Sequence, residues 1–256
     1  KTKNINKAMK RPSSSIMRRP AAAQKRATAA SVPWKPDDGP FTEFLRLQAA
    51  EDWDATICHP MTDAIAAGTV SEAVMRKYLI QDHKFLDAFV VLLASVIAHA
   101  PTLADRIPGS QFLGLIAGKE NTYFERSFIA LGVGPKDRTG EPLPVTAAFI
   151  KLMREAASSG RISDMLSVLV VAEWSYSEWA ERVKPLRCAH LPFWCAEWID
   201  LHSGESFAGV VAYLRGLLDR IAPDLSPTEL VSAKHKFCTA VKLERAFWNM
   251  AWGSSP

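Results

Sequence analysis

Long stretches of this chain contain neither glycine nor proline, and this feature limits the possible folds more than any other. Residues 71–100 and residues 161–184 are both uninterrupted in this way. Apolar residues recur through such stretches at helical spacing, and turn signals separate one stretch from the next. The chain shows no alternating strand pattern with hairpin turns. The sequence therefore predicts an all-α protein.

We expect a single bundle of about eight helices, with no internal repeat and no domain boundary after residue 40. The best-marked start is Ser226-Pro227-Thr228-Glu229, which combines an N-cap serine, a proline at the first helical position and a capping-box glutamate. The apolar run at 167–171 lies inside a long uninterrupted stretch, so it is predicted as buried helix. The expected helices span residues 42–58, 71–100, 110–131, 144–159, 162–184, 190–202, 205–222 and 227–250.

The charge of the chain is unevenly distributed. Residues 1–36 hold ten Lys or Arg and no acid, whereas residues 37–256 hold 21 basic and 27 acidic residues. The positive charge therefore belongs to the N-terminal part, and we do not expect the folded body to bind nucleic acid. Residues 1–40 are interpreted as a basic, flexible extension or a transit-like segment, and residues 41–256 as the helical domain.

The four cysteines are widely spaced and form no CxxC pair. This pattern argues against a disulfide scaffold and fits a reducing compartment. The expected location is cytoplasmic, or a plastid or mitochondrion if residues 1–36 are a transit peptide. The nearest approach to a metal pattern, Cys188 and His190 with Cys195, lacks a second ligand pair, so no metal or other cofactor is expected. No apolar run reaches the roughly 18 residues of a membrane span.

Three acids lie on apolar helix faces. The same-face neighbours of Asp82 include Tyr78, Phe85 and Leu86, and Glu244 is placed in the same way on the last helix. Glu173 follows seven uncharged residues and precedes Trp174. A single buried acid is usually explained by an ion pair, but three on separate helices can converge on one cavity. Aromatic residues on these faces form either ordinary core or a slot for a flat ring: Tyr78, Phe85, Phe149, Trp174, Tyr176 and Trp248.

Four segments together resemble the TenA/thiaminase II family: HPM at 59–61, YLIQDHKFL at 78–86, SSGRISDMLSVLVVAEWSY at 158–176 and ERAFWNMAW at 244–252. The resemblance covers about residues 41–252. It implies a heme-oxygenase-like all-α fold, assembly as a homo-oligomer, usually a tetramer, and hydrolysis of an aminopyrimidine breakdown product of thiamin to hydroxymethylpyrimidine and ammonia.

The resemblance also implies roles for individual residues. Asp82 matches the family residue that binds the aminopyrimidine, and Glu244 matches its acid/base glutamate. Phe85 and Phe149 fall where the family has aromatic contacts to the pyrimidine. Tyr176 matches a tyrosine near the nucleophile. Two further ring contacts are expected from His202, at a position that is often Tyr, and from Trp174.

One departure from the family pattern concerns the nucleophile. Ala172 stands where thiaminase II proteins carry a catalytic cysteine, and Glu173 follows it. The chain thus resembles the Cys-lacking, plant-type branch. We expect hydrolysis by water of the free aminopyrimidine or of its N-formyl derivative, between which the sequence does not choose. Asp82, Glu173 and Glu244 are the expected catalytic groups, and little cleavage of thiamin itself is expected. The alternatives are a non-catalytic protein that binds a pyrimidine, and a different reaction on the same fold, PqqC-like or di-iron.

Overall fold

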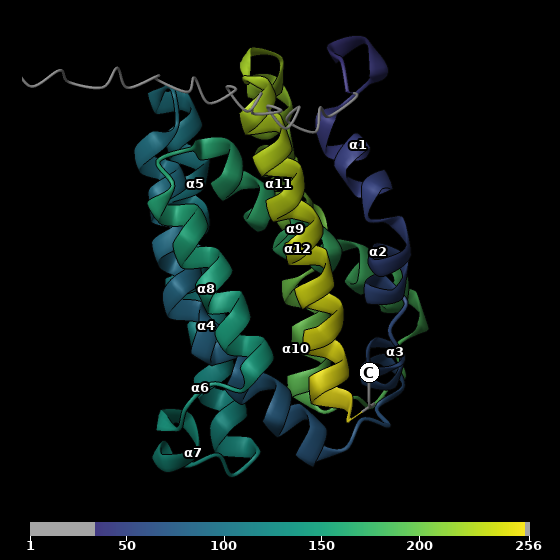
Figure 1. Ribbon diagram of the computed structural model, residues 1–256. Helices are drawn as coiled ribbons and strands as arrows, with labels where there is room; N and C mark the ends of the chain where they lie inside the picture. Colours follow the sequence, from purple (N-terminus) through teal and green to yellow (C-terminus); the bar gives the residue numbers. More distant parts are fainter. Residues whose placement is uncertain (1–33, 254–256) are drawn as a thin grey trace, which may run out of the picture.

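The computed structural model describes residues 34–253, and within that range the chain is all-α, with no strand. The predicted fold class is therefore confirmed, although the helices number twelve rather than about eight (Figure 1). They are α1 (Phe41–Gln48), α2 (Ala50–Ile57), α3 (Pro60–Ala67), α4 (Glu72–His99), α5 (Leu103–Leu115), α6 (Asn121–Ala130), α7 (Pro135–Thr139), α8 (Pro144–Ser158), α9 (Ile162–Val183), α10 (Phe193–Leu201), α11 (Glu205–Ile221) and α12 (Pro227–Trp252).

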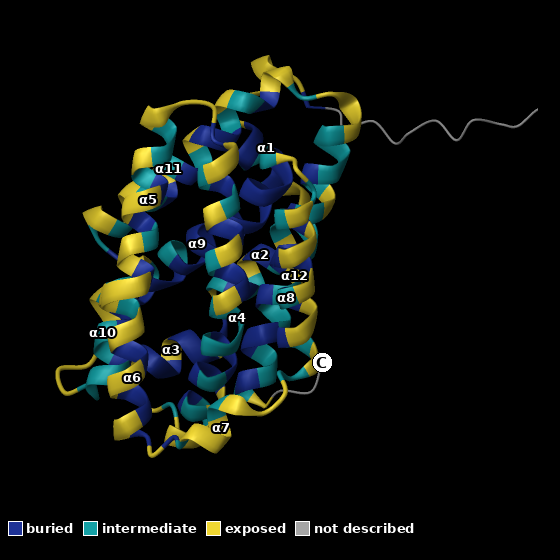
Figure 2. Cartoon of the chain, turned by 90° about the vertical axis from the view of Figure 1, so that its left-hand side faces the viewer, coloured by how far each residue is buried: buried dark blue, intermediate teal, exposed yellow. Residues whose placement is uncertain are grey.

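The helix α9 forms the centre of the bundle. Of its 22 residues 17 are buried, which is what an uninterrupted helix that is apolar on every face requires. It packs against α12, α11, α4, α8 and α2. Figure 2 shows the buried residues gathered in the interior and the exposed ones on the outer faces of the surrounding helices. None of the helices in the described part of the chain is long and apolar enough to cross a membrane.

Several expected helix boundaries are wrong, each for a local reason. The segment 42–58 is two helices, because the backbone at Ala49 leaves the helical region. The helix expected from residue 110 begins at Leu103, where the Oγ1 of Thr102 accepts a hydrogen bond from the amide of Asp105. Helices α3 and α7 are additional, and each begins with a proline, which suits the first helical position.

The stretch from α5 to α6 runs through a π-helical turn, Ile116–Glu120. Such turns admit one extra residue per turn and redirect the side chains that follow.

At the N-terminal end of the described range, Trp34 is buried and its ring packs on Phe41, with ring centroids 4.9 Å apart. Trp34 of the expected extension therefore packs on the domain, whereas residues 35–40 are exposed and residues 1–33 lie outside the described range.

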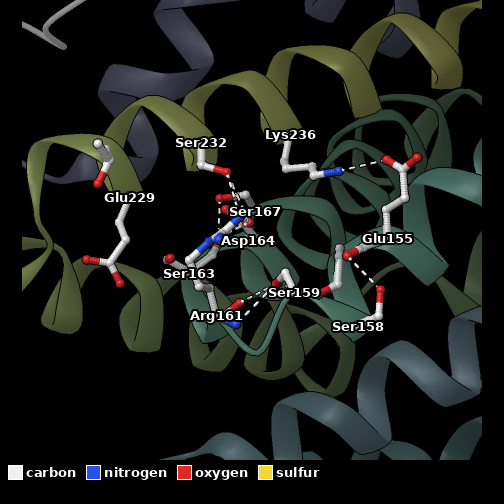
Figure 3. Close-up of polar contacts among 12 residues, drawn as sticks. Glu155, Ser158, Ser159, Arg161, Ser163, Asp164, Ser167, Glu229, Ser232 and Lys236 are labelled. Atoms are coloured by element: carbon white, nitrogen blue, oxygen red, sulfur yellow. Dashed lines mark hydrogen bonds and ion pairs between the residues drawn. The ribbon is translucent and has the colours of Figure 1, made fainter. Parts of the chain in front are cut away.

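A polar cluster joins the start of α9 to α12 (Figure 3). Asp164 is fully buried, and its Oδ2 accepts hydrogen bonds from Nε of Arg161 at 2.9 Å and from the hydroxyl of Ser232 at 3.0 Å. On the neighbouring exposed face, Lys236 of α12 donates to Glu155 of α8 at 3.0 Å. Asp164 thus links the start of the central helix α9 to α12.

We expect Asp164→Ala to lower the free energy of unfolding by about 1–3 kcal/mol, because it removes the acceptor of several partly buried hydrogen bonds. Urea denaturation followed by circular dichroism measures this. Glu155→Gln is the control on the exposed face, and its effect should be much smaller because water screens that ion pair. Equal effects of the two changes would mean that the Asp164 cluster does not hold the helices together.

Candidate active site

A cavity opens between the middle of α4, α9 and α12, closed by the π-helical turn and by the end of α10. Its empty space, with the solvent at its mouth included, is about 410 Å³. Ligand sites of helical bundles commonly lie between helices in this way. The residues that line the cavity are Asp82, Phe85, Leu86, Phe89, Ile116, Glu120, Ala172, Glu173, Tyr176, Trp198, His202 and Glu244.

The three acids singled out in the sequence all line this one cavity. Asp82 comes from α4, Glu173 from α9 and Glu244 from α12, and their residues are 5%, 7% and 2% exposed. Each lies on the buried face of its helix because apolar residues three and four positions away hold that face inward. The structure thus brings together groups that are 71 or more residues apart in the sequence.

A fourth acid, Glu120, lines the same cavity and does not figure among the sequence-predicted residues. It is the last residue of the π-helical turn and is partly exposed. The signal that points to it is modest: Ile116, Tyr123 and Phe124, all buried, lie four residues before it and three and four residues after it. The glycine and lysine at 118 and 119 obscure that pattern.

Burial dominates the electrostatics of the four acids. It raises the pKa of Glu244 from 4.5 to about 8 and the pKa of Glu120 to about 7. It also raises the pKa of Asp82 and of Glu173 well above their ordinary values, and the charges of Glu120 and Glu244 raise both further. A carboxyl group that loses water without gaining a cation holds its proton more tightly.

No lysine or arginine lines the described cavity, and its one histidine is neutral at neutral pH. Burial lowers the pKa of His202 to about 4. Its Nδ1 lies 2.8 Å from the carbonyl oxygen of Trp198, which can only accept, so Nδ1 carries the proton and Nε2 is left as an acceptor. The four acids therefore have no compensating positive charge in the cavity.

Residues 46–254 match the sequence profile of the TENA/THI-4/PQQC family. The chain belongs to this family. An aminopyrimidine aminohydrolase of Halalkalibacterium halodurans is 25% identical over 213 residues, covering 83% of this chain and 95% of that protein. A protein of Bacillus subtilis with the same name is 24% identical over 220 residues, covering 83% and 89%. A probable bifunctional TENA-E protein of Glycine max is 24% identical over 204 residues, covering 77% and 86%.

Solved structures show the same fold. A TenA homologue of Pyrococcus furiosus superposes with a TM-score of 0.75 at 22% identity, covering 83% of this chain and all of that one. A domain of Shewanella denitrificans described as having a heme-oxygenase-like fold superposes with a TM-score of 0.60 at 15% identity, covering 83% and 92%. The heme-oxygenase-like fold expected from the sequence is therefore confirmed.

In this family member, Ala172 lines the cavity beside Glu173, and none of the four cysteines does. Cys195 is buried away from the cavity, and burial raises the pKa of its thiol to about 12, so it stays protonated. Among the described residues, no group of three or more His, Cys, Asp or Glu is arranged to hold a metal ion.

The aromatic residues singled out in the sequence divide into two groups. Phe85 and Tyr176 line the cavity, and Trp198 lines it as well, unforeseen from the sequence. The hydroxyl of Tyr176 lies 2.6 Å from that of Tyr78, behind the cavity wall. This pair fixes the orientation of the Tyr176 ring.

Phe149 and Trp174 are not among the lining residues. Phe149 is fully buried behind Phe85, with ring centroids 5.6 Å apart. Trp174 packs on Trp53, and the guanidinium of Arg215 lies 3.6 Å from the centre of its ring. As the structure places them, Phe149 supports a lining residue and Trp174 belongs to the core on another side of α9.

The raised pKa of Glu244 makes stability depend on pH. The unfolded chain loses this proton near pH 4.5, whereas the folded chain keeps it to about pH 8. The folded state therefore binds more protons between these values, and stability falls as the pH rises through them. The variant Glu244→Gln cannot ionise at this position. We expect it to melt at about the same temperature as the wild type below pH 4.5. Between pH 4.5 and about pH 8 its melting temperature should exceed that of the wild type by an amount that grows with pH. Thermal melts across this range measure the difference; a constant difference would contradict burial of an ionisable Glu244.

Proposed function

We propose that this chain is an aminopyrimidine aminohydrolase of the Cys-lacking branch of its family, acting in thiamin salvage. It replaces the amino group on the exocyclic methylene of the pyrimidine by a hydroxyl from water, and releases ammonia. The observation that carries the proposal is the cavity itself: four carboxyl groups, no cation, and Ala172 where the family resemblance implies a cysteine. Relatives named aminopyrimidine aminohydrolases support the choice of substrate.

The charge of the cavity suits an amine. An aliphatic amine is protonated in neutral water. Carboxyl groups that no cation neutralises can release a proton to solvent and pair with it, because a bound cation lowers their pKa. An N-formylated amine is a neutral amide and lacks this attraction. The site therefore favours the free aminopyrimidine over its N-formyl derivative as substrate.

Each acid has a distinct task. Asp82 hydrogen-bonds the aminopyrimidine ring and sets its orientation beside Phe85 and Tyr176. Glu244 has a pKa of about 8 and is therefore protonated at neutral pH. It shares one proton with the substrate amine, and this proton is on the nitrogen when the C–N bond breaks. Glu173 takes a proton from the attacking water.

The base role of Glu173 requires its carboxylate form. Its pKa is raised first by burial and then by the negative charges of Glu120, Glu244 and Asp82. When those neighbours hold protons or face a bound cation, the repulsion disappears and Glu173 ionises more readily. Two acids in different environments can thus act as acid and base in one site.

The replacement of cysteine by alanine removes the covalent route. A thiolate is the nucleophile in cysteine catalysis, and a methyl group cannot substitute for it. Cleavage of intact thiamin, which the family resemblance associates with that cysteine, is therefore expected to be weak or absent.

We expect the purified protein to release ammonia from 4-amino-5-aminomethyl-2-methylpyrimidine. Asp82→Asn, Glu173→Gln and Glu244→Gln should each lower kcat/KM by roughly 10²–10⁴, the range of a positioned acid or base. Asp87→Asn, an exposed change on the same helix as Asp82, is the control and should leave the rate unchanged. A kcat/KM equal to that of the wild type in both Glu173→Gln and Glu244→Gln would contradict the assigned roles. Tight binding of the pyrimidine without ammonia release would indicate a binding protein instead.

The pH profile tests the acid role separately. Because Glu244 has to bring its proton to the substrate, kcat/KM should fall as the pH rises through about 8, its pKa in the free protein. Initial rates from pH 6 to pH 10, corrected for the separately titrated substrate amine, measure this. A corrected profile that stays flat to pH 10 would exclude Glu244 as the acid.

A further inference from the structure

We propose that Glu120 carries protons between the buried cavity and solvent, and so resets Glu173 and Glu244 after each turnover. This role rests on the hydrolysis proposed above, because it concerns the protons that this reaction displaces. It assigns a task to the one lining acid that the catalytic roles leave unused.

The position of Glu120 between two pockets is the first support. A second pocket of about 580 Å³ opens on the outside of the π-helical turn, and Glu120 is the single residue that lines both pockets. The outer pocket has a mixed wall, in which polar side chains lie among apolar ones; the polar ones besides Glu120 are Lys119, Asp200, Ser203 and Ser206. Glu120 is partly exposed, whereas Asp82, Glu173 and Glu244 are each less than 9% exposed.

The local backbone explains how Glu120 reaches both pockets. The π-helical turn Ile116–Glu120 interrupts the run of α5 into α6, and the extra residue changes the direction of the side chains at its end. Ile116 and Glu120 line the inner cavity, while Lys119 lines the outer pocket and not the inner cavity. Turns of this kind recur at functional sites, because they place a side chain where a regular helix cannot.

The proton balance of the reaction gives such a group a task. Water forms a C–O bond to the methylene carbon and gives a proton to the Glu173 carboxylate. The C–N bond breaks, its electron pair stays on nitrogen, and the nitrogen keeps the proton received from Glu244. The alcohol and ammonia leave, with Glu173 protonated and Glu244 ionised. Before the next turnover one proton has to leave Glu173 and one has to reach Glu244. Because the reaction consumes no net proton, these two acids are reset either by transfer inside the cavity or by exchange with solvent, and Glu120 provides the second route.

The other titratable groups around the cavity are poorly suited to this exchange. Glu120 faces Asp82 on α4, Glu173 on α9, Glu244 on α12 and His202 after α10, and on the outer side Lys119 and Asp200. Burial lowers the pKa of His202 to about 4 and raises that of Tyr176 well above 10, so neither exchanges protons readily at neutral pH. Burial brings the pKa of Glu120 to about 7, where both of its forms are populated.

The kinetic test uses Glu120→Gln, which keeps the shape and removes the titration. We expect kcat to fall on the order of 10²-fold while kcat/KM changes little, because proton return follows the chemical step. Imidazole, a small proton carrier, should restore kcat in proportion to its concentration, and Glu120→Asp should retain much of the rate. Glu125→Gln, an exposed change five residues further along, should behave as wild type. A loss confined to kcat/KM, or no rescue by imidazole, would overturn the proposal.

A second measurement does not depend on the reaction. After transfer to D₂O at neutral pH, the infrared carboxyl bands of the buried, protonated acids shift as each proton is replaced by deuterium. We expect the shift to be fast in the wild type and at least several-fold slower in Glu120→Gln, with Glu125→Gln again as control. Equal rates would overturn proton transfer through Glu120. If the wild type does not turn over the aminopyrimidine but deuterium exchange is slower in Glu120→Gln, the proposed reaction is contradicted and proton transfer through Glu120 is not.

Discussion

The structure depends on one constraint: residues 163–176 of α9 are buried on every face, so this helix has to be surrounded. Burying 17 of its 22 residues requires neighbours on all sides, and α4, α8, α11, α12 and α2 supply them. The hydrophobic effect that drives this arrangement is non-directional, so it also carries inward the few polar groups on those faces. Glu173 lies inside because α9 does, and Asp82 and Glu244 because their helices pack against it.

Burying acids without cations is costly, and the protein meets this cost by keeping protons on them. The raised pKa values of Glu120 and Glu244 mean that the folded state binds protons that the unfolded chain releases. The same property that weakens the fold at higher pH supplies proton donors at neutral pH. Stability and chemistry therefore draw on one physical cause, desolvation of carboxyl groups in a cavity.

The elements that sequence reasoning places well are those with strong local signals. Residues 71–100 and 161–184 form α4 and α9 because nothing in them interrupts a helix, and Ser226 caps α12 through the expected box with Glu229. The boundaries that it misses carry weaker local signals: the backbone leaves the helical region at Ala49 without a glycine or proline, and α5 begins at Leu103 with Thr102 as its cap. Proline at 108 suggests an end to a helix, yet it is accommodated inside α5.

The sequence by itself determined the all-α class and the inward direction of Asp82, Glu173 and Glu244, because helical periodicity relates residues three and four positions apart. Only the tertiary structure decided which side chains share a cavity, because that depends on how helices cross. It placed Phe149 and Trp174 behind the wall, brought Trp198 into it, and added Glu120 through a π-helical turn that no local pattern specifies. Pairwise spacing along a helix is a local property, whereas convergence across helices is set by packing of the whole core.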